Sequence, residues 1–212
     1  MKVLITGFDP FGGESINPAY EAVKRLPSQI SGAEIVTLEV PTVFGKSIEA
    51  VTTKIDQIHP DVVICVGQAG GRFEVTPERV AINVDDARIP DNEGNQPLGQ
   101  PVLEGAPDAY FSTLPVKAMV QKIRKRGIPS ALSNTAGTFV CNHLMFGVLD
   151  YLHQQNYGRG GFIHIPFLME QVVDKPGKPG MALETLTSAL EAAIEACVEH
   201  ETDVDGVGGT LH

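Results

Sequence analysis

Short apolar runs alternate along this chain with segments in which apolar residues recur every three or four positions. The first pattern is typical of strands and the second of helices. The run at residues 62–66, Val-Val-Ile-Cys-Val, contains no polar side chain, as expected of a strand that is covered on both faces. Helices that cross between successive strands provide such cover. The alternation therefore predicts an α/β fold with a largely parallel, twisted central sheet.

The expected elements follow from this periodicity and from local helix signals. Asn17 precedes Pro18, a pair that favours a helix N-terminus because asparagine caps the helix and proline suits its first position. We expect strands at residues 2–6, 33–40, 61–66, 79–84, 131–133 and 161–165. We expect helices at residues 17–26, 48–58, 114–123, 142–154 and 181–200. No repeat or linker divides the chain, so we expect one domain over residues 1–212, with a loose glycine-rich tail at residues 203–212.

The composition argues against several classes of partner. The net charge is −10 over 212 residues, which disfavours nucleic acid or an anionic membrane as the main partner. No apolar run reaches membrane-spanning length, and the N-terminus lacks the apolar region of a signal peptide. The three cysteines are widely spaced, so neither a disulfide framework nor a zinc motif is predicted. We expect a cytoplasmic protein with free thiols.

Four unusual segments follow the predicted strands. Glycine-rich stretches at residues 7–13 and 67–72 follow the first strand and the buried strand, a third loop leads to Cys141, and His164 lies near the end of the last strand. In open α/β sheets, ligands bind at the carboxyl ends of the strands. These segments are therefore expected to meet at one edge of the sheet and to form the functional site.

Cys141 is a candidate nucleophile because it lies at the beginning of the helix predicted at residues 142–154. Unpaired N–H groups and the positive end of the helix dipole favour a thiolate there. His164 is a candidate base, although a histidine in an apolar strand is also typical of a core. An acidic residue between Glu74 and Glu93 would complete a catalytic set, and the residues alone leave its identity open.

The other cysteines and a metal site are weaker candidates. Cys65 lies inside the apolar strand and Cys197 on the apolar face of a helix, so both are expected to pack in the core. Cys141 and His143 are close enough in sequence to suggest a metal site, but two further ligands at suitable spacing are missing. No metal is therefore expected.

The glycine-rich stretches do not match the phosphate-binding motifs, and they contain no lysine. The stretch at residues 7–13 instead contains Phe8 and Phe11, and Phe139 lies two residues before Cys141. Aromatic rings suit a small, flat, uncharged group better than a phosphate. Core packing is the alternative role for each of these rings.

Several long motifs in this chain resemble those of the pyroglutamyl peptidase I family, whose members are also called pyrrolidone-carboxylate peptidases. The motifs occur in order from residue 1 to roughly residue 200. They are residues 6–13 (Thr-Gly-Phe-Asp-Pro-Phe-Gly-Gly), 67–72 (Gly-Gln-Ala-Gly-Gly-Arg), 77–83, 86–94, 137–142 (Gly-Thr-Phe-Val-Cys-Asn) and 162–166.

The resemblance implies a cysteine exopeptidase that removes N-terminal pyroglutamate from peptides, with neither a metal nor an organic cofactor. Its implied catalytic triad is Cys141, His164 and Glu78, which selects Glu78 as the acid. The resemblance implies Arg88 as a donor to the oxyanion, and we expect the backbone N–H of Cys141 to be a second donor. The implied substrate-binding residues are Phe8, Phe11, Asn17, Gln68, Phe139 and Val140. The family fold is a single α/β/α sandwich, usually assembled as a homotetramer.

Two functions outside the peptidases remain compatible with an α/β architecture. A nucleoside-type phosphorylase would use the glycine-rich loops for phosphate and would tolerate loss of Cys141. A non-catalytic module would bind small lactams or nucleotides without turnover. The set of Cys141, His164 and Glu78 disfavours both. The sequence leaves open whether residues 91–107 close over a substrate.

Overall fold

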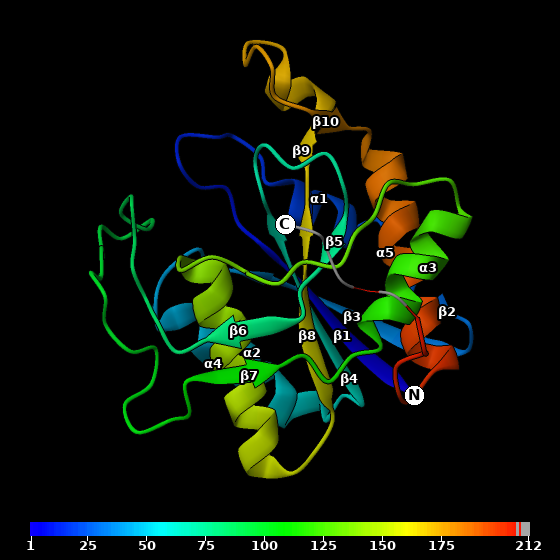
Figure 1. Ribbon diagram of the computed structural model, residues 1–212, viewed down its shortest axis with the longest axis horizontal. Coiled ribbons are helices and arrows are strands. Elements are labelled where there is room, and N and C mark those ends of the chain that lie inside the picture. The colour runs from blue at the N-terminus through cyan, green and yellow to red at the C-terminus, as the bar shows by residue number, and fades with distance from the viewer. Residues whose placement is uncertain (207, 209–212) are drawn as a thin grey trace.

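A computed structural model of the chain describes residues 1–206 and residue 208. Its centre is a six-stranded sheet in the order β2-β3-β1-β4-β8-β5 (Figure 1). The four inner strands are parallel: β3 (Ala33–Val40), β1 (Lys2–Phe8), β4 (Val62–Gln68) and β8 (Arg159–Ile165). The edge strands β2 (Gln29–Ile30) and β5 (Thr76–Pro77) run antiparallel to their neighbours. The expected α/β fold with a largely parallel sheet is confirmed.

Helices cover both faces of this sheet, so the elements form three layers (Figure 1). The helices are α1 (Pro18–Val23), α2 (Lys46–Ile58), α3 (Val116–Lys125), α4 (Val140–Gln155) and α5 (Leu183–Glu199). The first, third and fifth pack on one face, and α2 and α4 pack on the other. The expected helices are therefore present, and each begins or ends within a few residues of its predicted position.

The central strand β4 supplies side chains to both cores. Val62, Ile64 and Val66 lie in the cluster shared with α1, α3 and α5, whereas Val63 and Cys65 lie in the cluster shared with α2 and α4. Successive side chains of a strand point to opposite faces, so an uninterrupted apolar run fits a strand that is buried on both sides. The apolar run read from the sequence has this structural cause.

The N-terminus of α1 forms as predicted from Asn17 and Pro18. The Asn17 Oδ1 atom accepts a hydrogen bond from the Ala19 N–H at 3.0 Å, and Pro18 occupies the first helical position. The same side chain donates from Nδ2 to the Asp9 carbonyl at 2.8 Å. Asn17 therefore caps the helix and also holds the glycine-rich loop that follows β1.

The prediction of a strand at residues 131–133 is wrong. Only isolated parallel bridges form, between Val75 and Ser130 and between Glu78 and Ser133. The Ala131 N–H donates to the Val75 carbonyl, but the next bond of a parallel ladder would need an N–H from Pro77. Proline has no N–H, so the ladder is interrupted and the segment stays irregular.

The strand expected at residues 79–84 forms outside the main sheet. β6 (Val80–Ile82) pairs antiparallel with β7 (Ala109–Phe111) in a separate two-stranded ribbon beside α4 (Figure 1). Asn142 of α4 accepts a hydrogen bond from the Ile82 N–H and donates to the carbonyls of Ile82 and Val84. The Asn142 side chain thus bonds backbone groups at the edge of β6 that a further strand could otherwise have bonded.

Three short elements follow β8 and have no counterpart in the sequence prediction. They are β9 (Phe167–Leu168), the 3-10 turn η1 (Met169–Val172) and β10 (Gly180–Met181). These elements project beyond the carboxyl end of β8 (Figure 1). Their strands have two residues each, too few for an alternating pattern to be recognised.

The expected loose tail is held at two points where the structure describes it. The Asp203 carboxylate accepts hydrogen bonds from the N–H groups of Lys117 and Ala118 at the start of α3. Arg79 donates to the Gly208 carbonyl at 2.6 Å. Residues 207 and 209–212 lie outside the described part of the chain. Within the described part, no helix is both long and apolar enough to span a bilayer.

The cap at Asn17 leads to a stability prediction. Asn17→Ala removes the acceptor for the Ala19 N–H and the donor to Asp9, so urea unfolding should show a loss of about 1–2 kcal/mol. Asn17→Ser keeps a capping oxygen and should recover about half of that loss. Equal stability of the alanine variant and the wild-type protein would contradict the role of the cap.

Candidate active site

Cys141 is the second residue of α4, and Phe139, with extended backbone, precedes the helix. Among the described residues no side chain caps this helix start, so the N–H groups of its first turn can donate to a ligand. The Cys141 thiol lies directly on β4 at Gly67, where an added Cβ atom would lie 2.9 Å from Sγ. Glycine at this position therefore allows the helix start to approach the sheet.

His164 lies on the neighbouring strand β8 and is the register partner of Gly67. His164 shares with Phe162 the face of the sheet that α4 covers, and the two rings lie 4.8 Å apart between centroids. Gly67 thus has the thiol of Cys141 above it and His164 beside it. The structure brings together the two residues that the sequence predicted as nucleophile and base.

Glu78 completes this group from the opposite side of β8. Its fully buried carboxylate accepts a hydrogen bond at Oε1 from His164 Nδ1, with 2.7 Å between the atoms. The backbone N–H of Glu78 donates to the Phe162 carbonyl at 2.9 Å, which fixes the carboxylate beside the strand. The proton on Nδ1 leaves Nε2 of the neutral ring as the atom that can accept another proton.

Arg72 is a member of this group that the sequence analysis missed. Its Nη1 atom donates to Glu78 Oε1 at 2.6 Å, and Nη2 donates to the Thr135 carbonyl at 3.1 Å. Arg72 stands at the end of a predicted glycine-rich motif, which was the available signal. Its partner lies six residues further on, and no local pattern connects the two.

Two of the expected aromatic residues form a half-buried wall, and a third is more deeply placed. The rings of Phe11 and Phe139 lie 6.2 Å apart, and the ring of Phe44 meets Phe139 edge-on at 5.5 Å. Phe8 is only 2% exposed and packs against Phe162. Phe11 and Phe139 are therefore accessible from the solvent side of the site, whereas Phe8 lies beneath it.

The remaining expected binding residues have structural partners of their own. Val140 is fully buried in the core of the α4 face, and Asn17 is occupied as a helix cap. Gln68, at the end of β4, accepts a hydrogen bond at Oε1 from Gln171 Nε2 at 3.0 Å. Their contacts position the loops around the site, and direct contact with a substrate stays a prediction.

Arg88 is exposed and lies in a segment that is bonded to the loop before Cys141. The Asp86 N–H donates to the Thr138 carbonyl at 2.9 Å, and the Thr138 hydroxyl donates back to the Asp86 carbonyl at 2.7 Å. Arg88 follows this contact by two residues. It is therefore near the start of α4, as an oxyanion donor has to be, although its role stays a prediction.

Known proteins resemble this chain over almost its whole length. The sequence profile described as pyroglutamyl peptidase matches residues 1–200. This chain belongs to the pyroglutamyl peptidase family. It is 60% identical over 213 residues to a pyrrolidone-carboxylate peptidase of Clostridium perfringens, with 100% of each chain covered. It is 58% identical over 216 residues to one from Streptococcus pyogenes, again with full coverage of both.

Solved structures of the family have the same fold. Pyroglutamyl peptidase I from Bacillus amyloliquefaciens is 51% identical and superimposes with a TM-score of 0.95, covering 97% of this chain and 99% of that one. A mutant pyrrolidone carboxyl peptidase from Pyrococcus furiosus is 44% identical with a TM-score of 0.91, covering 94% and 99%. The family resemblance predicted from the motifs is confirmed, and it disfavours a phosphorylase or a non-catalytic module.

The ionisation of the site differs from the expectation for Cys141. Burial raises the pKa of the Cys141 thiol to about 12, and the negative charge of Glu78 adds to the rise, while Arg72 opposes it. The expectation that the helix start alone favours a thiolate was therefore wrong for the free protein. The local dipole is outweighed by a desolvation that only the tertiary structure reveals.

The partner groups have complementary ionisation. Burial lowers the pKa of His164 despite the hydrogen bond from its ring to Glu78, so the imidazole is neutral at pH 7. Burial alone would raise the pKa of Glu78, but its hydrogen bond to His164 and the positive charge of Arg72 bring it below its usual range. The resting site of this family member is a thiol, a neutral imidazole and a carboxylate.

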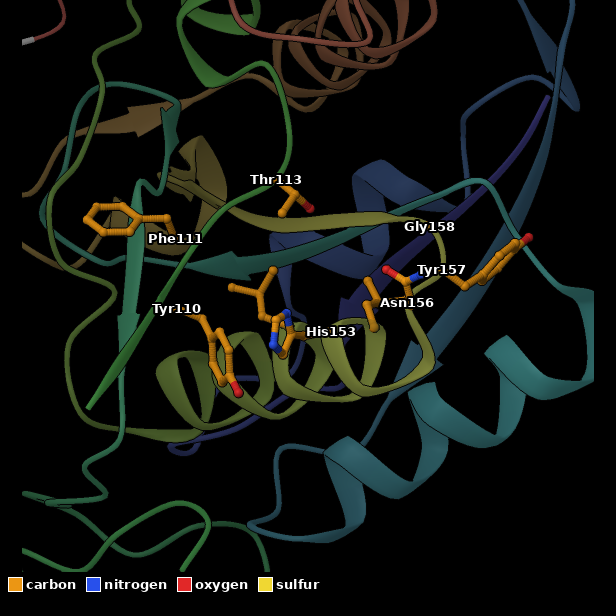
Figure 2. A pocket seen from close by; sticks show the side chains of 9 residues that line it. Tyr110, Phe111, Thr113, His153, Asn156, Tyr157 and Gly158 are labelled. Carbon is orange, nitrogen blue, oxygen red and sulfur yellow. The ribbon is translucent and has the colours of Figure 1, made fainter. Parts of the chain in front are cut away.

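Two other features lie outside this group. Among the described residues, no cluster of three or more histidine, cysteine, aspartate or glutamate side chains is arranged to hold a metal. A cavity of about 250 Å³ lies at the other end of α4, and Figure 2 shows Tyr110 and His153 among the side chains that line it. None of the expected site residues lines this cavity.

The resting thiol can be tested by alkylation. The rate at which iodoacetamide modifies Cys141 should rise about tenfold per pH unit between about pH 6 and about pH 9, because thiolate is the minor form throughout that range. The Cys141→Ser variant measures the background from the two other cysteines. A rate that is already constant between about pH 6 and about pH 8 would indicate a preformed thiolate–imidazolium pair instead.

Proposed function

We propose that this chain hydrolyses the peptide bond after an N-terminal pyroglutamyl residue, with Cys141 as nucleophile, His164 as general base and acid, and Glu78 as the group that orients the histidine. The observation that carries the proposal is the junction at Gly67. The thiol lies on this glycine, and its register partner on β8 is a histidine hydrogen-bonded to a buried carboxylate. Acyl transfer uses a nucleophile, a base beside it and an acid that orients the base, and these three residues supply the matching groups.

The reaction begins from the neutral thiol and imidazole. His164 takes the thiol proton at Nε2 as Sγ of Cys141 bonds to the pyroglutamyl carbonyl carbon, and the carbonyl oxygen becomes an oxyanion. The buried Glu78 carboxylate stabilises the imidazolium that forms. The imidazolium then gives its proton to the departing amine as the C–N bond breaks, which leaves a thioester on Cys141.

The second half of the cycle restores the enzyme. His164, neutral again, removes a proton from water as the water oxygen attacks the thioester carbonyl. The C–S bond breaks, the thiolate regains a proton from the imidazolium, and pyroglutamate leaves. Arg72 contributes at a distance, because its bond to Glu78 keeps that carboxylate ionised and correctly oriented through both halves.

The oxyanion has two proposed donors. The backbone N–H of Cys141 lies in the first turn of α4, where N–H groups lack helical partners. Arg88 extends from the segment that is bonded to Thr138, close to the same helix start. A well-aimed donor of this kind typically lowers the barrier by about 3–4 kcal/mol.

The proposed substrate suits the aromatic wall. The pyroglutamyl ring is small, flat and uncharged, so it gains from contact with Phe11 and Phe139 and needs no ion-pairing partner. Backbone groups at the strand ends would bond the lactam N–H and C=O. A prolyl substrate lacks the lactam carbonyl and would leave a buried donor unpaired, so discrimination against proline is expected to be large.

The assembly and the cellular location are part of the same proposal. The family resemblance supports a homotetramer that acts on peptides with N-terminal pyroglutamate, and the free cysteines support a cytoplasmic location. Light scattering on the purified protein measures the assembly directly.

The nucleophile is tested by comparing two cysteine variants. Cys141→Ser should lower the release of a fluorophore from a pyroglutamyl amide by at least about a thousandfold, because a hydroxyl beside a neutral histidine is a much poorer nucleophile here. Cys197→Ala, on the buried face of α5, should keep most of the activity. Similar losses in both variants, or rapid turnover of the prolyl amide, would contradict the proposal.

The orienting role of Glu78 predicts a specific kinetic change. Glu78→Gln keeps an oxygen for the His164 N–H but removes the charge that stabilises the imidazolium, so kcat should fall by about a thousandfold with little change in KM. Steady-state kinetics with the pyroglutamyl amide measure both constants. A rise in KM at constant kcat would instead assign Glu78 to substrate binding.

A further inference from the structure

A second buried histidine–carboxylate pair lies beside the proposed nucleophile and has no part in the proposed chemistry. His143, two residues after Cys141 on α4, bonds through Nδ1 to Oδ2 of Asp85 at 2.7 Å. Each of the two residues is 5% exposed. This pair resembles His164 and Glu78 in its atoms and distances, so its second ring nitrogen decides what it can do.

That second nitrogen is already occupied. The backbone N–H of Gly45 donates to His143 Nε2 at 2.8 Å. The ring therefore has its proton on Nδ1, from which it donates a hydrogen bond to Asp85, and it accepts a hydrogen bond at Nε2. His143 cannot accept the proton of Cys141 without losing Gly45, so its geometry suits a fixed support and not a general base.

The support reaches the aromatic wall through a series of ring contacts. Phe44, the neighbour of Gly45, meets the His143 ring edge-on with 5.2 Å between centroids. The same Phe44 ring meets Phe139 edge-on at 5.5 Å, and Phe139 lies 6.2 Å from Phe11. The bond between Gly45 and His143 therefore fixes the loop whose aromatic ring holds Phe139 in place.

Asp85 attaches the third segment. Its backbone exchanges hydrogen bonds with Gln100 in both directions, at 2.7 and 3.0 Å, and the next residue is bonded to Thr138 before Cys141. The Oδ1 atom of Asp85 is buried and has no hydrogen-bond partner among the described residues. Such burial costs stability, so the Asp85 contact is better explained by the position it imposes than by the stability it adds.

We propose that His143 and Asp85 are a positioning pair for recognition of the pyroglutamyl ring. The pair joins the loop of Gly45, the start of α4 and the segment of Asp85, and it sets the position of Phe139 through Phe44. The inference rests on the proposed function, because Phe139 matters only if the ring of the substrate lies against it. Loss of the pair is therefore expected to weaken substrate binding and to leave the chemical step intact.

The test uses variants that remove defined hydrogen bonds. His143→Phe keeps a ring against Phe44 and removes both hydrogen bonds, and Asp85→Ala removes the acceptor of the Nδ1 proton. Both should raise KM for the pyroglutamyl amide by about tenfold with kcat within about threefold of the wild-type value. Asp85→Asn keeps an oxygen for Nδ1 and should restore most of the affinity.

A matched control separates positioning from general stability. Tyr110→Phe removes the hydrogen bond from the Tyr110 hydroxyl to Asp150, a buried residue of α4. Asp150 lies nine residues along the helix from Cys141, which is about 13 Å. The Tyr110→Phe variant should lower the melting temperature without changing KM. Combining His143→Phe with Phe44→Leu should raise KM by less than the product of the two single effects, because both act through one contact.

Each result bears on the proposal in one direction. It is overturned if the folded His143→Phe and Asp85→Ala variants keep the wild-type KM, if they lower kcat at unchanged KM, or if Tyr110→Phe raises KM equally. A KM increase confined to the pair, with recovery in Asp85→Asn, supports it. Retained turnover in Cys141→Ser would defeat the proposed function instead, so the two failures are distinguishable.

Discussion

The contact between Cys141 and Gly67 is the constraint on which the arrangement of the site depends. A Cβ atom on Gly67 would lie 2.9 Å from the Cys141 sulfur and 2.7 Å from the Phe162 ring, and real Cβ atoms are essentially never so close to another heavy atom. The missing side chain lets the start of α4 rest on β4. Because the register partner of Gly67 is His164, this one close approach determines which strand residue stands beside the thiol.

Burial then decides how the groups are ionised. The raised pKa of the thiol and the lowered pKa of His164 share one cause, the low polarity of their surroundings, and Glu78 stays charged because His164 and Arg72 face it. The proton of the free site therefore lies on the sulfur of Cys141. The pair of His143 and Asp85 has the same kind of hydrogen bond, yet the Gly45 N–H occupies its second ring nitrogen. His164 can act as a base because its Nε2 atom can accept a proton, whereas the bonded Nε2 atom of His143 limits that residue to a structural role.

The sequence predicted features that arise locally. The strands and helices follow from apolar periodicity, and the start of α1 follows from Asn17 and Pro18. The strand at residues 131–133 failed because its ladder depends on Pro77, a distant residue without an N–H. The thiolate expected at Cys141 failed because desolvation is set by the tertiary structure. Glu78 was selected by family resemblance, and the roles of Arg72 and Asp85 become visible only when their hydrogen-bond partners are known.

The thioester on Cys141 is the central claim, and a rapid-quench experiment tests it most directly. A pyroglutamyl p-nitrophenyl ester has a good leaving group, so acylation of Cys141 should be faster than hydrolysis of the thioester. The thioester should therefore accumulate within the first turnover. Mass spectrometry of the quenched, digested protein should find one pyroglutamyl group on the peptide that contains Cys141. A burst of p-nitrophenol with no acyl group on that peptide, or with the group on another residue, would contradict the mechanism.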